Sequence, residues 1–214
     1  TGLYRIAVAT VLFGTETDKR EGGIAMSAPT VTDFRRRLLD GLAASIAERG
    51  YRDTTVADVV RAARTSKRTF YDHFSTKEEC FVELLTANNE ELVDTVRAAV
   101  DPDAGWQEQV RQAVSAYVDT IDANPAVTLS WIRELPALGE AARPMLRRGF
   151  GRLAAMIVEL STGTGFRRAG LAPLSPTVAV ILVGGLRELT AQTVEDGSPA
   201  TGIVEPAVAA SIAL

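Results

Sequence analysis

The chain of 214 residues has few of the residues on which covalent cross-links and metal centres depend. It contains one cysteine, Cys80, and one histidine, His73. A single cysteine excludes an intrachain disulfide framework and a thiolate cluster within one chain. Cys80 follows a capped helix start, as an ordinary buried thiol does, so no nucleophile–base pair indicates catalysis. We therefore expect no enzyme, no metal and no cofactor, and the reducing cytoplasm as the compartment.

Long hydrophobic runs and strand alternation are also missing. The apolar run 6–13 has eight residues, far fewer than the roughly 20 that cross a bilayer. No small-residue cleavage site follows it, so we favour an upstream extension over a secretory signal. We expect residues 1–30 to form an N-terminal extension, the functional protein to begin near Met26, and no membrane partner.

The net charge of −4 is unevenly divided along the chain. Residues 31–77 hold ten Lys/Arg and six Asp/Glu, whereas residues 78–214 hold ten and eighteen. A basic segment joined to an acidic body is expected where one end of a protein meets phosphates. On charge alone, chance clustering in a helical protein remains the alternative.

Helical periodicity dominates from residue 31 onward. Four apolar residues recur at every fourth position: Phe34, Leu38, Leu42 and Ile46. This spacing predicts an amphipathic helix that ends at Gly50. Arg35, Arg36 and Arg37 lie in its first turn, where the helix dipole disfavours bases. They form either a solvated face or a phosphate contact, and we favour the second.

Residues 53–79 predict two short helices around a polar turn, followed by the start of a third. A cap at Thr55, with an acid three residues later, starts the first helix. Ser66 or Thr65 can cap the second, over 67–74. Eight residues rise roughly 12 Å, which is also about the width of the DNA major groove.

The helix 67–74 has two different sides. Phe70 and Phe74 lie about 40° apart around the axis and define the buried side. Arg68, Thr69 and Asp72 point most nearly away from it. Tyr71 and His73 flank the apolar stripe. This distribution indicates a helix that enters a groove of DNA.

The third helix begins at a predicted capping box formed by Thr76 and Glu79. Its first backbone N–H groups, with Lys77 beside them, form a potential phosphate site. Farther along, Phe81, Leu84, Leu85, Leu92 and Val96 are expected to face inward.

Residues 51–80 closely resemble the DNA-binding signature of the TetR family of transcriptional regulators. The similarity lies in the TTVADV opening, the SKRTFYDHF helix and the STKE close. It implies an all-α fold, with a three-helix helix-turn-helix DNA-binding domain over 31–77. It also implies a helical effector-binding and dimerisation domain over 78–214.

The resemblance implies that Thr55 and Lys77 hold phosphates, while five residues of the recognition helix face DNA: Lys67, Arg68, Thr69, Tyr71 and His73. We add four candidate DNA contacts from the residue pattern: Arg35, Arg36, Arg64 and Ser66. Of these residues, Arg68 suits a guanine edge and Thr69 a thymine methyl. Asp72 either accepts from a cytosine amino group or pairs with Arg68 at i,i+4, and we favour the pair.

The turn differs from the family at Arg64, where glycine is usual because the residue commonly needs positive φ. A non-glycine residue there costs on the order of 1 kcal/mol. We expect either this cost or a rebuilt turn.

Downstream helices are expected over 106–123, from Asn124 through Ile132, over 140–161, 176–196 and 205–214. Residues 163–174 are expected to form a loop, because Gly163 and Gly165 lack the strand and lysine of a phosphate-binding loop. The apolar run 178–186 suits a dimer seam or, almost equally, a buried core helix.

The resemblance implies an effector cavity in this second domain. Five large residues are our candidate ligand contacts: Tyr117, Trp131, Met145, Phe150 and Met156. Few charges fall on these inward faces, so we expect a small, largely apolar effector. Aromatic and Met residues at helical spacing are, however, more often plain core.

The residue pattern together with the resemblance implies a homodimeric, ligand-responsive regulator, most simply a repressor of a near-palindromic double-stranded DNA operator. The alternative is an all-helical binding or scaffold protein whose helix-turn-helix no longer reads DNA. Asp72 and Arg64 are the residues that favour it.

Overall fold

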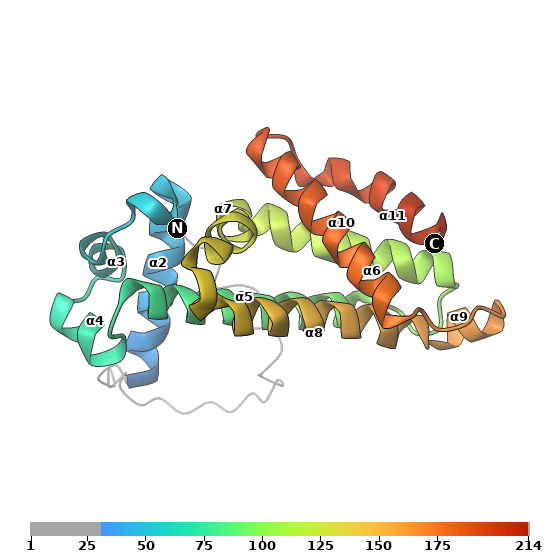
Figure 1. The fold of residues 1–214 in the computed structure, drawn as a ribbon, viewed down its shortest axis with the longest axis horizontal. Helices are drawn as coiled ribbons and strands as arrows, with labels where there is room; N and C mark the ends of the chain where they lie inside the picture. Colours follow the sequence, from blue (N-terminus) through green and yellow to red (C-terminus); the bar gives the residue numbers. More distant parts are fainter. Residues whose placement is uncertain (1–30, 214) are drawn as a thin grey trace, which may run out of the picture. The chain divides into compact units, whose positions relative to one another are not determined.

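A computed structural model describes residues 31–213, which form helices joined by short turns (Figure 1). No strand occurs within this range, and the all-α prediction is confirmed. The expected N-terminal extension, including the start near Met26, lies outside the described residues. The elements are α2 (Val31–Asp53), α3 (Val56–Ala62), α4 (Lys67–His73), α5 (Lys77–Ala99), α6 (Trp106–Ala123), α7 (Pro125–Leu129), the π-helix η1 (Ser130–Glu134), the 3-10 helix η2 (Leu135–Ala142), α8 (Arg143–Ser161), α9 (Thr164–Arg168), α10 (Pro176–Glu195), the 3-10 helix η3 (Ala200–Ile203) and α11 (Val204–Ala213).

The first three helices, α2, α3 and α4, pack around one apolar core with the start of α5. Its fully buried side chains include Leu38, Leu42, Phe70, Phe74 and Phe81. Removal of these side chains from water is the main force that holds such short helices together. We call the part of the chain over 31–77 the head and the part over 78–213 the body.

Both ends of the head helices carry the local signals that the sequence predicts. Gly50 has φ 79°, and it interrupts regular helix geometry where the end of the first helix is expected. At the start of α3, the Thr55 hydroxyl accepts from the Asp58 N–H at 3.3 Å, and the Asp58 carboxylate accepts from the Thr55 N–H at 3.0 Å. This reciprocal pair is the predicted capping box.

The cap of α5 differs in one bond from the predicted capping box. The Thr76 hydroxyl accepts from the Glu79 N–H at 3.1 Å, as expected. The Glu79 carboxylate, however, accepts from the N–H of Ser75 at 2.7 Å. The acid therefore reaches one residue beyond the cap and still satisfies a free donor near the helix start.

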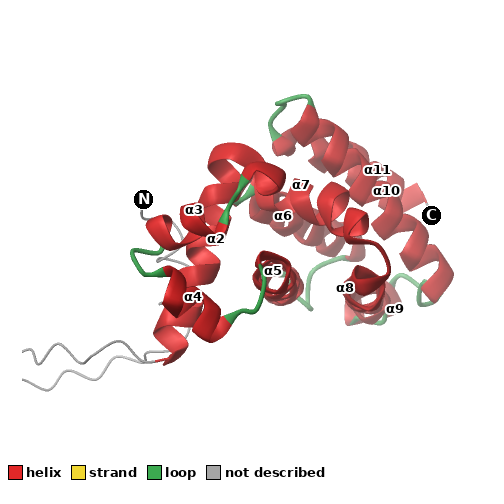
Figure 2. Ribbon diagram, turned by 60° about the vertical axis from the view of Figure 1, so that its left-hand side comes forward, coloured by secondary structure: helices red, strands yellow, loops and turns green. Residues whose placement is uncertain are grey.

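The body consists mainly of α5, α6, α8, α10 and α11 (Figure 2). Three apolar clusters hold it together: Val114 and Ile121 with Ile203 and Val208; Val93 and Val96 with Met156; and Ala154 with Ala179 and Val183. The core of the head also continues into the body, because Val127, Leu135 and Met145 belong to the same cluster as Phe70. No gap in the packing separates the two parts.

The chain departs from the predicted elements at three places. Residues 163–174 contain the short helix α9, because Gly165 lies against the Ala104 carbonyl and Phe166 packs on Trp106 at 6.0 Å between ring centroids. The helix that begins at Pro125 changes to a π-helix at Ser130. The next helix then starts at Arg143, a few residues late, because 3-10 geometry precedes it.

By length and apolar composition alone, one helix within the described range, α10, could cross a membrane. A core helix of a helical protein passes the same test. Ala179 and Val183 of α10 pack against α8, so this helix is part of the body.

We predict that the Asp58 cap makes stability depend on acid pH. The hydrogen bond from the Thr55 hydroxyl, helped by the Thr55 backbone N–H, lowers the pKa of Asp58 to about 2. The stabilisation is therefore complete above the unfolded pKa of about 3.9 and is lost as pH falls through about 2.

Urea unfolding followed by circular dichroism at pH 7, 4 and 2 tests this. Asp58→Asn should lower the midpoint at pH 7 and show a smaller further drop between pH 4 and 2 than the wild type. The exposed Asp119 on α6 provides the control, Asp119→Asn. If the urea midpoints of both variants fell by the same amount at all three pH values, the prediction would be contradicted.

Candidate functional site

Helix α4 has the two sides that its sequence predicts. Phe70 and Phe74 are buried, with their ring centroids 5.7 Å apart. The other side carries polar and basic residues: Lys67, Arg68, Tyr71 and Asp72 are exposed, and Thr69 and His73 are half-buried. The aromatic side chain of Tyr71 is 58% exposed, so it is accessible to a binding partner. Ser66 caps the helix, since its hydroxyl accepts from the Thr69 N–H at 3.1 Å.

The turn before α4 keeps the geometry for which glycine is usual. Arg64 has φ 52°, so the turn is not rebuilt and the residue bears the strain of a left-handed conformation. The Arg37 guanidinium donates to the Ala63 carbonyl at 2.6 Å and to the Arg64 carbonyl at 2.8 Å. These bonds satisfy two carbonyls after the end of α3 and connect the Arg64 turn to α2.

Arg35 is engaged within the head. Its guanidinium forms a forked pair with the Glu83 carboxylate, donates to the His73 carbonyl at 3.0 Å, and lies 4.5 Å from the Phe74 ring centroid. The hydrogen bond to Glu83 is the largest cause that raises the pKa of Arg35. Arg35 therefore joins α2, α4 and α5, which is a different role from the predicted phosphate contact. Of the three adjacent arginines, Arg36 is the exposed one.

Lys77 is also used inside the protein. Its ammonium donates to the Tyr51 carbonyl at 3.0 Å and to the Thr54 carbonyl at 2.8 Å. It lies 4.2 Å from the Tyr51 ring centroid, and Tyr51 stacks on Phe81 at 3.7 Å. The side chain thus joins the end of α2 to α5. Nothing in the sequence distinguishes this role from the predicted one.

The predicted pair between Arg68 and Asp72 is wrong. Over residues 31–213 no ion pair or hydrogen bond joins them, although both are exposed on α4. An exposed pair at this spacing gains only a few tenths of a kcal/mol, which does not offset the entropy of holding two side chains. The Arg68 guanidinium is therefore open toward solvent.

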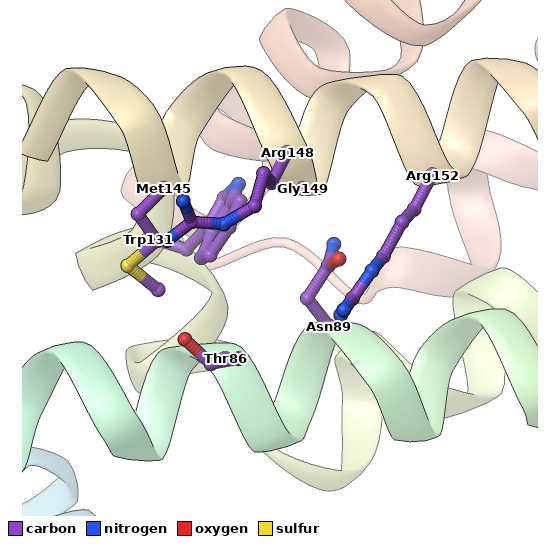
Figure 3. A pocket seen from close by; sticks show the side chains of 7 residues that line it. All are labelled: Thr86, Asn89, Trp131, Met145, Arg148, Gly149 and Arg152. Carbon is purple, nitrogen blue, oxygen red and sulfur yellow. The ribbon is translucent and has the colours of Figure 1, made fainter.

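A small pocket lies in the body between α5, α8 and η1 (Figure 3). Its volume is about 20 Å³, which is room for a single water. Seven residues line it: Thr86, Asn89, Trp131, Met145, Arg148, Gly149 and Arg152. Sequence reasoning identified only Trp131 and Met145. The other five lining residues lie on α5 and α8, which are far apart in sequence. The spacing of apolar residues within each helix does not indicate that the two helices line one pocket.

The pocket is less apolar than the sequence predicts, because four of its seven lining residues are polar or charged. Asn89 is 6% exposed, and its buried Oδ1 has no hydrogen-bond partner. Gly149 allows the Trp131 indole to lie directly on α8, since a Cβ at this position would overlap the ring. Within the described range, Arg152 pairs with Glu90 at 2.5 Å, whereas no pair is formed by Arg148.

The other three candidate ligand residues lie elsewhere. Tyr117 is partly buried, and its hydroxyl lies 2.8 Å from the Thr190 hydroxyl; burial of the phenol raises its pKa. Phe150 packs with the cluster around Ala179, and Met156 packs with Val96. These residues form core, which is the plainer reading of aromatic and Met side chains at helical spacing.

Cys80 is fully buried, as its position after the cap predicts. Burial raises the pKa of its thiol to about 12, so the reactive thiolate is not formed at neutral pH.

The segment from the middle of α2 to the first half of α5 also matches a known family. Residues 38–84 match the sequence model of the bacterial regulatory proteins of the tetR family. This match contains α3, the Arg64 turn and all of α4. This segment of the chain is therefore similar to the DNA-binding part of TetR-family regulators.

Individual relatives agree with this assignment. The chain is 22% identical to the HTH-type transcriptional regulator YhgD of Bacillus subtilis over 151 residues, which cover 71% of this chain and 78% of YhgD. It is 33% identical to the HTH-type transcriptional repressor KstR2 of Mycobacterium tuberculosis over 116 residues, 54% of this chain and 58% of KstR2. The chain is thus similar to transcriptional regulators with a helix-turn-helix.

Solved structures share the fold of this chain. The fatty acid degradation regulator FadR from Bacillus halodurans has a TM-score of 0.72 at 19% identity and covers 89% of this chain and 95% of its own. FadR from Bacillus subtilis, in complex with stearoyl-CoA, has a TM-score of 0.69 at 15% identity, with 81% and 95% covered.

We predict that Arg64→Gly stabilises the protein. Glycine adopts φ 52° without the clash of a Cβ, so the free energy of unfolding should rise by about 1 kcal/mol. Urea unfolding at pH 7 measures the change. Arg64→Ala is the matched control, because it removes the same long side chain but keeps the Cβ. Equal midpoints for the two variants would mean that the turn bears no backbone strain.

Proposed function

We propose that the chain is a homodimeric, ligand-responsive transcriptional repressor that acts on DNA in the cytoplasm. The exposed face of α4 is the observation that carries the proposal, since Phe70 and Phe74 fix its orientation and Arg68 is unpaired. The head carries a charge of +4 and residues 78–214 carry −8. A basic helix on an acidic protein favours contact with DNA through that helix.

The contacts divide into two kinds. We propose that Arg68 and Thr69 contact base edges. Seven further residues are proposed to contact the sugar–phosphate backbone of DNA: Arg36, Thr55, Arg64, Ser66, Lys67, Tyr71 and His73. Phosphate contacts fix position, and base contacts give sequence preference. Arg35 and Lys77 support this surface from inside, because their polar atoms already bind protein groups. We also propose 31–77 as the DNA-binding domain and 78–214 as the effector-binding and dimerisation domain.

The outer surface of α10 favours dimerisation. Val180 is 47% exposed and Ile181 60% exposed, and Gly185 beyond them leaves room for a second helix. Exposed β-branched apolar side chains on a helix gain free energy when a partner covers them. Ile212 of α11 is another exposed apolar residue, so both helices contribute to the proposed seam. A twofold dimer would place two α4 helices in successive major grooves of a near-palindromic operator.

The π-helix η1 supports coupling between an effector and the head. Trp131 of η1 lines the pocket, and Glu134 of η1 pairs with Arg52 at the end of α2 at 2.8 Å. Arg133 of η1 pairs with Glu188 at 3.0 Å and with Glu195 at 2.7 Å, both on α10. A ligand that displaces Trp131 would therefore act on a segment bonded to both the head and the proposed dimer helix.

Two structures with this fold are described as complexes with acyl-CoA: FadR from Bacillus subtilis with stearoyl-CoA and FadR from Thermus thermophilus with lauroyl-CoA. They support the proposal that this chain also binds a small molecule in its helical body.

Selection of bound sequences from a random pool of duplexes tests the proposal as a whole. The expected result is a near-palindrome whose half-sites are separated by one helical turn or a multiple of it. Binding should weaken steeply with salt, since phosphate contacts release counterions. An unenriched pool with salt-independent retention would instead support a helical scaffold protein that no longer reads DNA.

We predict that Arg68→Ala weakens operator binding by about 1–3 kcal/mol and relaxes sequence preference at one position. Lys67→Ala should weaken binding to all duplexes and reduce the salt slope by about 1. Fluorescence anisotropy at several salt concentrations measures both effects. Arg167→Ala, on α9 at the end of the body away from α4 (Figure 1), removes the same charge as a control. An equal loss of operator affinity in Arg68→Ala and Arg167→Ala would reject the proposed role of α4.

We predict that Ile181→Glu converts the dimer to a monomer, because the seam would bury unpaired carboxylates. Analytical ultracentrifugation measures the mass, and affinity for a two-half-site operator should fall with it. Leu171→Glu is the matched control, since Leu171 is 40% exposed and lies outside α10 and α11. A dimer that persists in Ile181→Glu would place the seam elsewhere.

A further inference from the structure

The basic residues of the acidic body are concentrated on one helix. Residues 78–214 contain ten arginines against eighteen acids, and four of these arginines lie in the first half of α8. They are Arg143, Arg147, Arg148 and Arg152, and all four are exposed. Two of them, Arg148 and Arg152, line the pocket. The charged residues that line the pocket are therefore basic, whereas the body as a whole is acidic.

This positive charge is only partly neutralised. Arg152 pairs with Glu90 at 2.5 Å, while Arg148 has no ion pair with any described residue. The lining itself contains no carboxylate. Guanidinium groups bind carboxylates and phosphates in a forked geometry that matches their paired oxygens. The mouth thus favours an anionic group.

The interior of the pocket has a free acceptor. Asn89 Oδ1 is buried without a hydrogen-bond partner, and Figure 3 shows the side chain between α5 and α8. A buried acceptor that stays unpaired costs about 1–3 kcal/mol, so a donor placed there is favoured. A hydroxyl or N–H group on a ligand would supply it.

The third side of the pocket is flat and apolar. The Trp131 ring lies against the α8 backbone at Gly149, and Met145 lies beside it. Aromatic and thioether surfaces suit a planar apolar group. The space of about 20 Å³ holds only a water, so a larger ligand must displace the Trp131 ring or the Arg148 side chain.

We infer that this pocket binds a small organic anion in which a carboxylate or phosphate lies close to a hydrogen-bond donor on a flat apolar body. The inference rests on the proposed function, because it names the chemical class of the effector. It replaces the largely apolar effector that the sequence predicts. The anion would lie at Arg148 and Arg152, the donor at Asn89, and the apolar body against Trp131.

Fluorine NMR of the full chain labelled with 5-fluorotryptophan tests the inference. The protein has two tryptophans, Trp131 in the pocket and Trp106, which packs on Phe166. Trp106→Phe assigns the two resonances, and Trp106 then serves as an internal control. The probes are salicylate, its neutral amide salicylamide, benzoate, which lacks the hydroxyl, and phenyl phosphate, all at constant ionic strength.

We expect salicylate or phenyl phosphate to shift the Trp131 resonance saturably and leave that of Trp106 in place. Phenyl phosphate and benzoate both lack the hydroxyl, so the tighter binder of these two identifies the preferred anion as phosphate or carboxylate. Salicylamide should bind at least tenfold more weakly than salicylate, and benzoate severalfold more weakly. Arg148→Gln should weaken the anionic probes at least tenfold. Arg147→Gln, which makes the same change one residue away and outside the pocket, should not.

The inference is overturned by equal binding of salicylate and salicylamide, by equal effects of the two arginine variants, or by no response of Trp131 to any anion. Equal binding of salicylate and benzoate would remove the role of Asn89. Duplex binding measured on the same protein separates this inference from the proposed function. Duplex binding without an anion response rejects the site alone, and an anion response without duplex binding rejects the DNA-binding function alone.

Discussion

The burial of Phe70 and Phe74 is the constraint on which the exposed surface of α4, proposed to contact DNA, depends. A helix of seven residues is unstable alone, so α4 exists because these rings pack into the head. Arg35 covers the Phe74 ring and also holds the carbonyl of His73, the last residue of α4. The direction of every exposed side chain on α4 follows from this anchoring. The residues that orient this surface are thus themselves buried in the head.

The head could be predicted in detail because its signals are local. Ser66 and Thr76 each bind a backbone N–H three residues away, so the sequence contains both partners of the cap. Gly50 and Arg64 adopt positive φ where the helix end and the turn require it. The all-α fold and the recognition helix follow from such signals together with apolar periodicity.

The roles of several charged residues could not be predicted, because their partners lie far along the chain. The sequence places Arg35 and Lys77 at the DNA edge, yet Glu83 and the Tyr51 carbonyl engage them. The pocket shows the same limit. Gly149 matters there only because Trp131 of another helix lies on it, and periodicity carries no record of such an approach. Tyr117, Phe150 and Met156 have the same pattern as Trp131 but lie in the core.

The number of residues in the π-helix η1 determines which of its side chains reach the pocket, α10 and α2. Its hydrogen bond from the Leu135 N–H to the Ser130 carbonyl spans five residues, one more than in an α-helix. Trp131, Arg133 and Glu134 thereby reach the pocket, α10 and α2 from a single turn. Loss of one residue here would return this turn to α-helical spacing and change which of its side chains face the pocket, α10 and α2. Single substitutions, by contrast, would remove these contacts one at a time.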